Sequence, residues 1–170
     1  MLTLRCTRAV RARLHLPENL PLPQASSGVL GDWYVHLVRF GHVQLILATS
    51  ERSLLTVLLP ARDLRKNLSH NIRTAVAALL EALDVSPESA RREIAAMEPV
   101  AFGRAENRRV LGSMNDFAFQ ARIHLAGGEG DLLAVALRLA ETPMSAIGLR
   151  SGDLGYPDKL ARELLASHVV

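Results

Sequence analysis

The densest group of polar side chains in this chain lies in the run ENRRVLGSMNDFAFQ, residues 106–120. Asn107 has the side chain of a helix N-cap, and Arg108 and Arg109 follow it directly. The first turn of a helix has free backbone N–H groups and a positive dipole end, which attract anions. A guanidinium can bind two oxygens of a phosphate or carboxylate at once. The pattern predicts an anion-binding site at Asn107, Arg108 and Arg109, with Arg108 as the main charged contact.

A second group of polar residues either supports this site or forms a reaction centre with Arg108. Its members are Arg52, Ser113, Asn115 and Asp116. This set suits a small hydrolase or nuclease, although the run LGSMN lacks the second glycine of a GxSxG nucleophile elbow. A structural alternative also stays open, in which the run only starts a capped helix whose arginines pair with Glu106 and Asp116.

The sequence contains no motif of a metal site or of a phosphate-binding loop. No two of the six histidines share a helical ligand spacing, and neither HExxH nor CxxC occurs. The run GGEGD, residues 127–131, lacks the lysine and the preceding strand of a phosphate-binding loop. We therefore predict no metal and no cofactor. Cys6 alternates with Leu2 and Leu4, which predicts a buried structural thiol rather than a nucleophile.

The elements that must position these residues begin with strands. Alternating apolar residues predict a strand at 2–6, and a clear β region follows at 33–40, 43–49 and 54–59. Gly41 and His42 suit a two-residue hairpin turn with glycine first. The strand at 43–49 is apolar on both faces, so it should lie in the middle. We predict a three-stranded antiparallel meander, which the N-terminal strand joins.

Helical periodicity accounts for most of the remaining chain. It predicts helices over 7–15, 63–84, 86–98, 107–125, 131–141 and 157–168. Ser86 should cap the third of these, and the fourth has an alternative start at Ser113. Residues 16–28 form a proline-rich loop, and residues 99–103 form either a short strand or an extended link. We predict an α+β fold over 1–170, one domain in which a small antiparallel sheet is packed with four to five helices.

Charge and hydropathy limit the classes of function. The net charge is +3, which by itself does not imply nucleic acid without a basic patch on one face. The local excess of arginine at residues 5–13 suits either a phosphate partner or a solvated helix face. No apolar run is long enough to cross a membrane and no secretory signal is visible, so we expect a cytoplasmic protein.

Five runs together resemble a known family. They are LTLRCT, LGDWYVHL, ERSLLTVLLPARD, NRRVLGSMNDFAF and ETPMSAIG, in this order along nearly the whole chain. The chain resembles a family of small uncharacterised bacterial proteins that carry a domain of unknown function. The resemblance implies one compact bacterial domain and transfers no catalytic residues. Two classes of function stay open: a non-enzymatic binding or accessory protein for an anionic ligand or nucleic acid, and a small enzyme.

Overall fold

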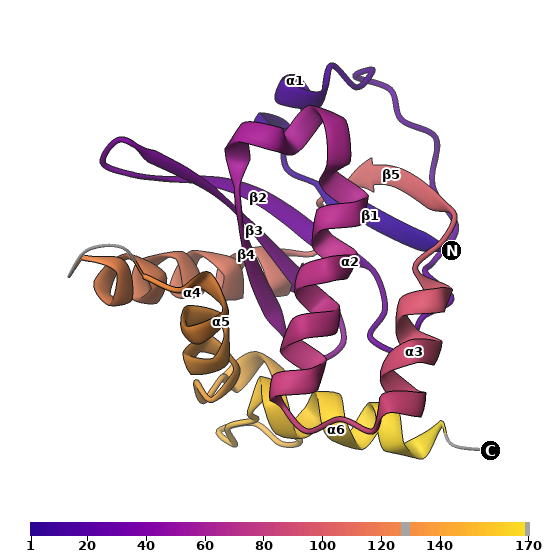
Figure 1. The fold of residues 1–170 in the computed structure, drawn as a ribbon, viewed down its shortest axis with the longest axis vertical. Coiled ribbons are helices and arrows are strands. Elements are labelled where there is room, and N and C mark those ends of the chain that lie inside the picture. The colour runs from indigo at the N-terminus through magenta and orange to yellow at the C-terminus, as the bar shows by residue number, and fades with distance from the viewer. Residues whose placement is uncertain (127–129, 169–170) are drawn as a thin grey trace.

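The computed structural model describes residues 1–126 and 130–168, and these residues form an α+β fold (Figure 1). The strands are β1 (Leu2–Cys6), β2 (Trp33–Phe40), β3 (Val43–Ser50), β4 (Thr56–Pro60) and β5 (Val100–Arg104). The helices are α1 (Arg8–Leu14), α2 (Leu64–Ala82), α3 (Pro87–Ala96), α4 (Arg108–Leu125), α5 (Leu132–Ala140) and α6 (Pro157–Ser167). Two short 3₁₀ helices, η1 (Ala61–Asp63) and η2 (Ser145–Ile147), complete the described elements.

The five strands form one sheet in the order β4-β3-β2-β1-β5. The predicted meander is confirmed, because β3 pairs antiparallel with both β2 and β4. The prediction of an antiparallel sheet needs correction for β1, which pairs parallel with β2 and with β5. A parallel pair needs a long crossover connection, and α1 with the loop after it supplies one between β1 and β2. The sheet is therefore mixed and five-stranded, and residues 100–104 are a strand rather than a link.

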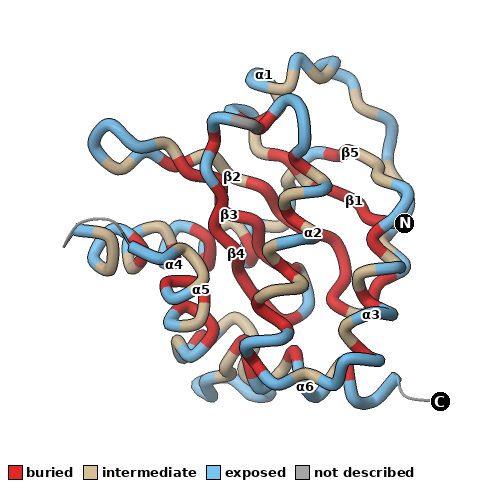
Figure 2. Tube along the Cα trace, in the orientation of Figure 1, coloured by how far each residue is buried: buried red, intermediate tan, exposed pale blue. Residues whose placement is uncertain are grey.

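Apolar side chains of the strands and helices form a common core. Figure 2 shows most of β1, β2, β3 and β4 and parts of the helices as buried, whereas β5 is largely intermediate. The largest fully buried side chains include Trp33, Leu47, Ile72 and Phe117. Helices α2 and α5 pack on β4, whereas α4 packs on β2 and β3. Cys6 is only 1% exposed, as the alternation with Leu2 and Leu4 predicts.

The helix boundaries largely follow the local sequence signals. Ser86 caps α3 by accepting a hydrogen bond from the amide of Ser89, as predicted. Helix α4 begins at Arg108 after the cap Asn107, so the alternative start at Ser113 is wrong. Six α-helices lie in the described part of the chain, against the four to five predicted. The predicted helix end in the run GGEGD falls on residues 127–129, outside the described residues.

Strand directions bring several connections to one end of the sheet. Strands β1, β2 and β5 are mutually parallel, and β4 shares their direction because both β2 and β4 are antiparallel to β3. Four carboxyl ends of strands therefore meet at the same end, which we call the carboxyl end of the sheet. Helix α1, the β2–β3 hairpin, and η1 with the start of α2 all follow from it.

Candidate functional site

The predicted cap at the start of α4 is present. The Asn107 Oδ1 atom accepts hydrogen bonds from the amides of Arg109 at 3.0 Å and Val110 at 3.5 Å. The Asn107 Nδ2 atom donates to Glu51 Oε1 at 3.3 Å, which ties the helix start to the residue after β3. The cap thus already satisfies two of the first-turn N–H groups. Binding of an anion at this helix end would therefore depend mainly on the charge of nearby side chains.

The two arginines after the cap differ in their availability. Both are exposed. The Arg109 Nη1 atom donates to the carbonyl of Ala146 at 3.0 Å, so this side chain joins α4 to η2. Within the described residues, Arg108 has neither a hydrogen bond from its side chain nor an ion pair, and neither arginine pairs with Glu106 or Asp116. Arg108 is therefore the cation that the helix start leaves available.

The structure does not bring the predicted supporting residues into one pocket. Ser113 is 3% exposed, and its hydroxyl donates to the carbonyl of Arg109 one turn earlier. Asn115 and Asp116 point to solvent on the exposed side of α4. The Arg52 side chain turns toward another segment, where it donates to the carbonyl of Val29 at 3.3 Å. No two of these polar groups share a hydrogen bond, so the arrangement lacks a nucleophile with an adjacent base.

Tyr34 lies beneath this helix start in a polar cluster that the sequence did not indicate. Burial raises the pKa of the Tyr34 hydroxyl, and the nearby Glu51 carboxylate adds to the rise. A hydrogen bond from the backbone N–H of Asn107 acts in the opposite direction. Because Tyr34 is only 4% exposed, we assign it to the support of the helix start.

A partly buried ion pair lies on the other side of this cluster. The Arg5 Nε atom donates to Asp32 Oδ2 at 2.8 Å, and Asp32 Oδ1 accepts the amide of Ser26 at 2.7 Å. A cleft of about 220 Å³ adjoins Arg5; it is lined by Arg5, residues 19–23, Arg104 and Glu106. Arg5 is satisfied by Asp32, and Arg104 donates to the carbonyl of Glu18. Both cations of this cleft thus have partners within the chain.

Glu93 provides a second buried charge, far from the start of α4 in the chain. Its carboxylate is 3% exposed and accepts the amides of Val29 at 2.7 Å and Leu30 at 3.1 Å. Burial raises the pKa of Glu93, whereas these hydrogen bonds and the nearby Arg52 and His168 lower it. A side chain at Gly28 would put its Cβ 2.5 Å from the carboxylate. Glu93 therefore holds the backbone of residues 28–30 in place.

A group of exposed basic residues lies at the carboxyl end of the sheet. It comes from three separate segments: α1 with the residue after it, the β2–β3 hairpin, and η1 with the first turns of α2. Its exposed members are Arg8, Arg13, His15, Arg39, His42, Arg62, Arg65 and Lys66, and we call them the basic surface. The segments 7–15, 36–44 and 61–70 of the sequence contain one acidic residue, Asp63.

Hydrogen bonds hold the three segments together. The Arg13 Nη1 atom donates to Gln44 Oε1 at 3.3 Å, and Gln44 is the strand partner of Arg39. The Arg65 Nε atom donates to the carbonyl of Arg13 at 3.0 Å, and its Nη2 atom contacts the ring of His15. These contacts link α1 to the hairpin on one side and to α2 on the other. The basic surface is thus one feature, built from residues far apart in the sequence.

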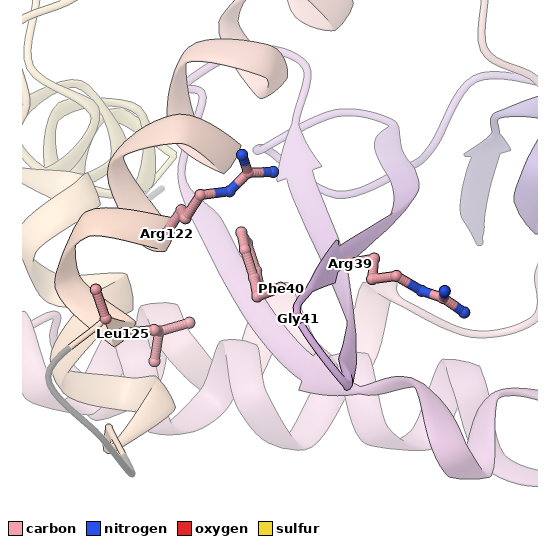
Figure 3. Close-up of a pocket in the computed structure, with 6 residues that line it drawn as sticks. Arg39, Phe40, Gly41, Arg122 and Leu125 are labelled. Carbon is pink, nitrogen blue, oxygen red and sulfur yellow. The ribbon is translucent and has the colours of Figure 1, made fainter.

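Three cations of the basic surface have no partner among the described side chains and carbonyls. They are Arg8 on α1, Arg39 on the hairpin and Lys66 on α2, one from each segment. Figure 3 shows Arg39 pointing away from the ring of Phe40, on the other side of the hairpin. That ring instead lies under Arg122 of α4, whose guanidinium carbon is 5.7 Å from the ring centroid. The pocket of about 520 Å³ beside them is largely apolar, and Arg39 is the one member of the basic surface that lines it.

Acidic residues gather at the other end of the sheet. Helix α2 runs away from the carboxyl end and finishes near Glu81 and Asp84, and α3 begins next to Glu88. Glu98 precedes β5, at the amino end of that strand. Cations accompany these acidic residues, since Arg73 pairs with Glu98 and Arg92 pairs with Glu88. The start of α4 lies beside the amino end of β2, because Asn107 contacts Glu51, the residue that follows β3 and whose amide donates to the carbonyl of Asp32.

The fold and these features together define a mixed-sheet α+β protein with a basic surface at the carboxyl ends of its strands. A family model for a domain of unknown function (DUF6933) matches residues 3–160, so the chain belongs to that family. Searches among curated proteins and among solved structures find no match. No helix in the described residues has the length and apolar character needed to cross a membrane.

Proposed function

We propose that this protein is a non-enzymatic binding protein that contacts the phosphates of nucleic acid with its basic surface. The observation that carries the proposal is the joining of three cation-bearing segments at one end of the sheet. A solvated helix face would explain the arginines of α1 alone. It does not explain why the hairpin and the start of α2 add Arg39, Arg65 and Lys66 to the same end. An electropositive patch of this kind is the usual electrostatic footprint of a nucleic-acid-binding protein.

The extent of the surface favours a polyanion over a small ligand. Helix α1 alone, with seven residues, is about 10 Å long. Duplex DNA carries about one negative charge per 1.7 Å of its axis, so several phosphates would face the three segments at once. A single phosphate or carboxylate would engage only one or two of these cations.

The composition of the surface favours contacts to the backbone of a duplex. Proteins that grip single strands stack bases on exposed aromatic side chains. The segments 7–15, 36–44 and 61–70, which carry the basic surface, contain a single Phe, Tyr or Trp residue, Phe40. The ring of Phe40 is covered by Arg122. Phosphate contacts without stacking position a protein on nucleic acid but carry little sequence information, so binding should be nearly independent of sequence.

The start of α4 adds a second, smaller element to the proposal. Arg108 is exposed and unpaired among the described residues, and it lies apart from the basic surface, next to the cap Asn107 that contacts Glu51. We assign it the role of a further phosphate contact, with Asn107 capping the helix and Arg109 bound to Ala146. The dispersed positions of Arg52, Ser113, Asn115 and Asp116 support binding more than hydrolysis, because catalysis needs these groups within reach of one another.

The test compares two triple variants that remove the same charge. Arg8→Gln, Arg39→Gln and Lys66→Gln are combined in the first variant. Arg91→Gln, Arg150→Gln and Lys159→Gln are combined in the control; these exposed cations lie on α3, in the loop after η2 and on α6. Binding to a fluorescent duplex of about 20 base pairs is followed by anisotropy at about 50 mM salt, where electrostatic binding is strong.

The first triple variant should lose at least about tenfold in affinity for the duplex, whereas the control should lose only a few-fold through its lower net charge. Equal losses in the two variants would show that net charge, rather than the basic surface, drives binding. Absence of binding by the wild-type protein would refute the proposed function. In the same assay, Arg108→Ala should weaken binding a few-fold with an unchanged melting temperature. Unchanged affinity in that variant would make the α4 start purely structural.

A further inference from the structure

The outward side of α4 exposes two large apolar side chains. Phe119 is 65% exposed and Ile123, one turn later, is 59% exposed. Phe117, two residues before Phe119, is completely buried. Two residues correspond to about 200° around an α-helix, so Phe119 points almost directly away from the core. The chain has only four phenylalanines, and exposing one of them so far leaves an apolar patch without a partner.

Gly112 lies on the same outward side, seven residues or about two turns before Phe119. It is exposed, and a Cβ atom built on it would have no neighbour within 4 Å. Glycine inside a helix makes the helix less stable than alanine does. Nothing within the chain approaches Gly112 closely enough to require the missing side chain. Close approach of another molecule would provide a reason for it.

Charged side chains on this face complement one another across a twofold axis. Asp116 lies three residues before Phe119 and Arg122 lies three residues after it, and both are exposed. The Arg122 guanidinium lies over the ring of Phe40, and within the described residues it has no hydrogen bond or ion pair. Among the described residues Asp116 has no hydrogen bond or ion pair. If two α4 helices pack antiparallel with Phe119 at the crossing, each Asp116 faces Arg122 of the other copy. The same register sets Gly112 opposite Ala126, so two small residues face each other about two turns from the crossing.

We propose that the outward side of α4 is a dimer interface, on which a second copy of this chain packs antiparallel about Phe119. The two Phe119 rings meet at the twofold axis, and two Asp116–Arg122 pairs flank them. An interface of this kind is isologous, since the same patch serves both copies. The proposal does not depend on nucleic-acid binding, because the interface uses none of the cations of the basic surface.

The dimer should be weak. Helix α4 has 18 residues and is about 27 Å long. One helix face buries less than the roughly 800 Å² per partner of a standard stable interface. We therefore expect monomer and dimer to exchange in the micromolar range, and the measurement must span protein concentrations from about 1 µM to 1 mM.

The test is sedimentation equilibrium of the full chain and its variants. Asp116→Arg and Arg122→Asp should each weaken dimerisation at least tenfold, and combining them should restore it, because the pair is re-formed with its signs exchanged. Phe119→Ser should also weaken dimerisation at least tenfold. Leu22→Ser, which removes a 90% exposed apolar side chain in a loop, is the matched control and should change nothing.

Substitutions of Gly112 test the same interface independently. In the monomer, Gly112→Ala should raise the melting temperature, because helix propensity improves and nothing clashes. Gly112→Leu should fold equally well but weaken dimerisation severalfold, since the bulk separates the helices. The proposal is overturned if the wild type remains monomeric up to 1 mM. It is also overturned if the double charge exchange fails to restore a dimer that the single variants weaken.

Discussion

Substitution of Leu47 tests most directly whether β3 lies at the centre of the core. It lies on β3, between its strand partners His36 on β2 and Leu58 on β4, and it is fully buried. Leu47→Ala removes three carbon atoms from a site enclosed by strands on both sides, where the backbone cannot collapse freely. Substitutions of this kind cost about 2–5 kcal/mol, through lost burial and the cavity left behind.

That cost converts into a measurable shift of the melting temperature. Globular proteins unfold with an entropy of about 2.1 cal/mol/K per residue, or about 0.36 kcal/mol/K for 170 residues. A loss of about 2–5 kcal/mol should thus lower the melting temperature by about 6–14 °C. Thermal unfolding followed by circular dichroism gives the midpoint, and urea unfolding with an unchanged m-value confirms that the loss is in stability.

Val43→Ala is the control for this substitution. Val43 begins the same strand but is 55% exposed near the hairpin turn, so its loss should cost no more than about 0.5 kcal/mol. Equal midpoints for wild type and Leu47→Ala would mean that β3 is not the centre of the core. A large loss of stability in Val43→Ala with none in Leu47→Ala would mean that the hairpin end of β3, rather than its middle, is buried.

Two further predictions concern buried titratable groups. Burial raises the pKa of the Cys6 thiol to about 12, so the folded protein should react with a soluble thiol reagent far more slowly than a free cysteine, and rapid stoichiometric labelling would contradict its structural role. Burial raises the pKa of Glu93 above its usual 4.5, so the folded state holds the Glu93 proton more tightly than the unfolded state does. Its contribution to stability should be greatest below pH 4.5 and be lost as pH rises through the folded pKa. The wild-type free energy of unfolding minus that of Glu93→Gln, measured in urea from pH 4 to 8, should therefore fall with pH, and a rise would contradict the assignment.

Local signals in the sequence predicted much of the fold. The alternation of Leu2, Leu4 and Cys6, the glycine of the hairpin turn, and the caps Ser86 and Asn107 act within a few residues, and the structure contains all of them. Strand direction was not predictable in this way, because alternation is the same in parallel and antiparallel strands. The parallel pairing of β1 with β2 and β5 depends on crossover connections that carry little pattern of their own.

The candidate site was predictable only in part, for the same physical reason. Asn107 and Arg108 are neighbours in the sequence, so the cap and the exposed cation beside it could be expected. Arg52 lies just after β3, and only the fold shows that it turns toward Val29. The basic surface joins Arg13, Arg39 and Lys66 from segments more than 20 residues apart. Its signal in the sequence is the near absence of acidic residues from three separate segments, which becomes meaningful once the strand order is known.

The salt dependence of duplex binding tests the central claim most directly. Each phosphate contact contributes about 0.9 to the slope of log K against log salt concentration. The Arg8, Arg39 and Lys66 triple variant lacks three of the proposed contacts, so its slope should be shallower than the wild-type slope by about 2.7 between roughly 50 and 200 mM salt. The control triple should keep a slope close to that of the wild type. Equal slopes for all three proteins, or a wild-type affinity that does not change with salt, would contradict phosphate binding at the basic surface.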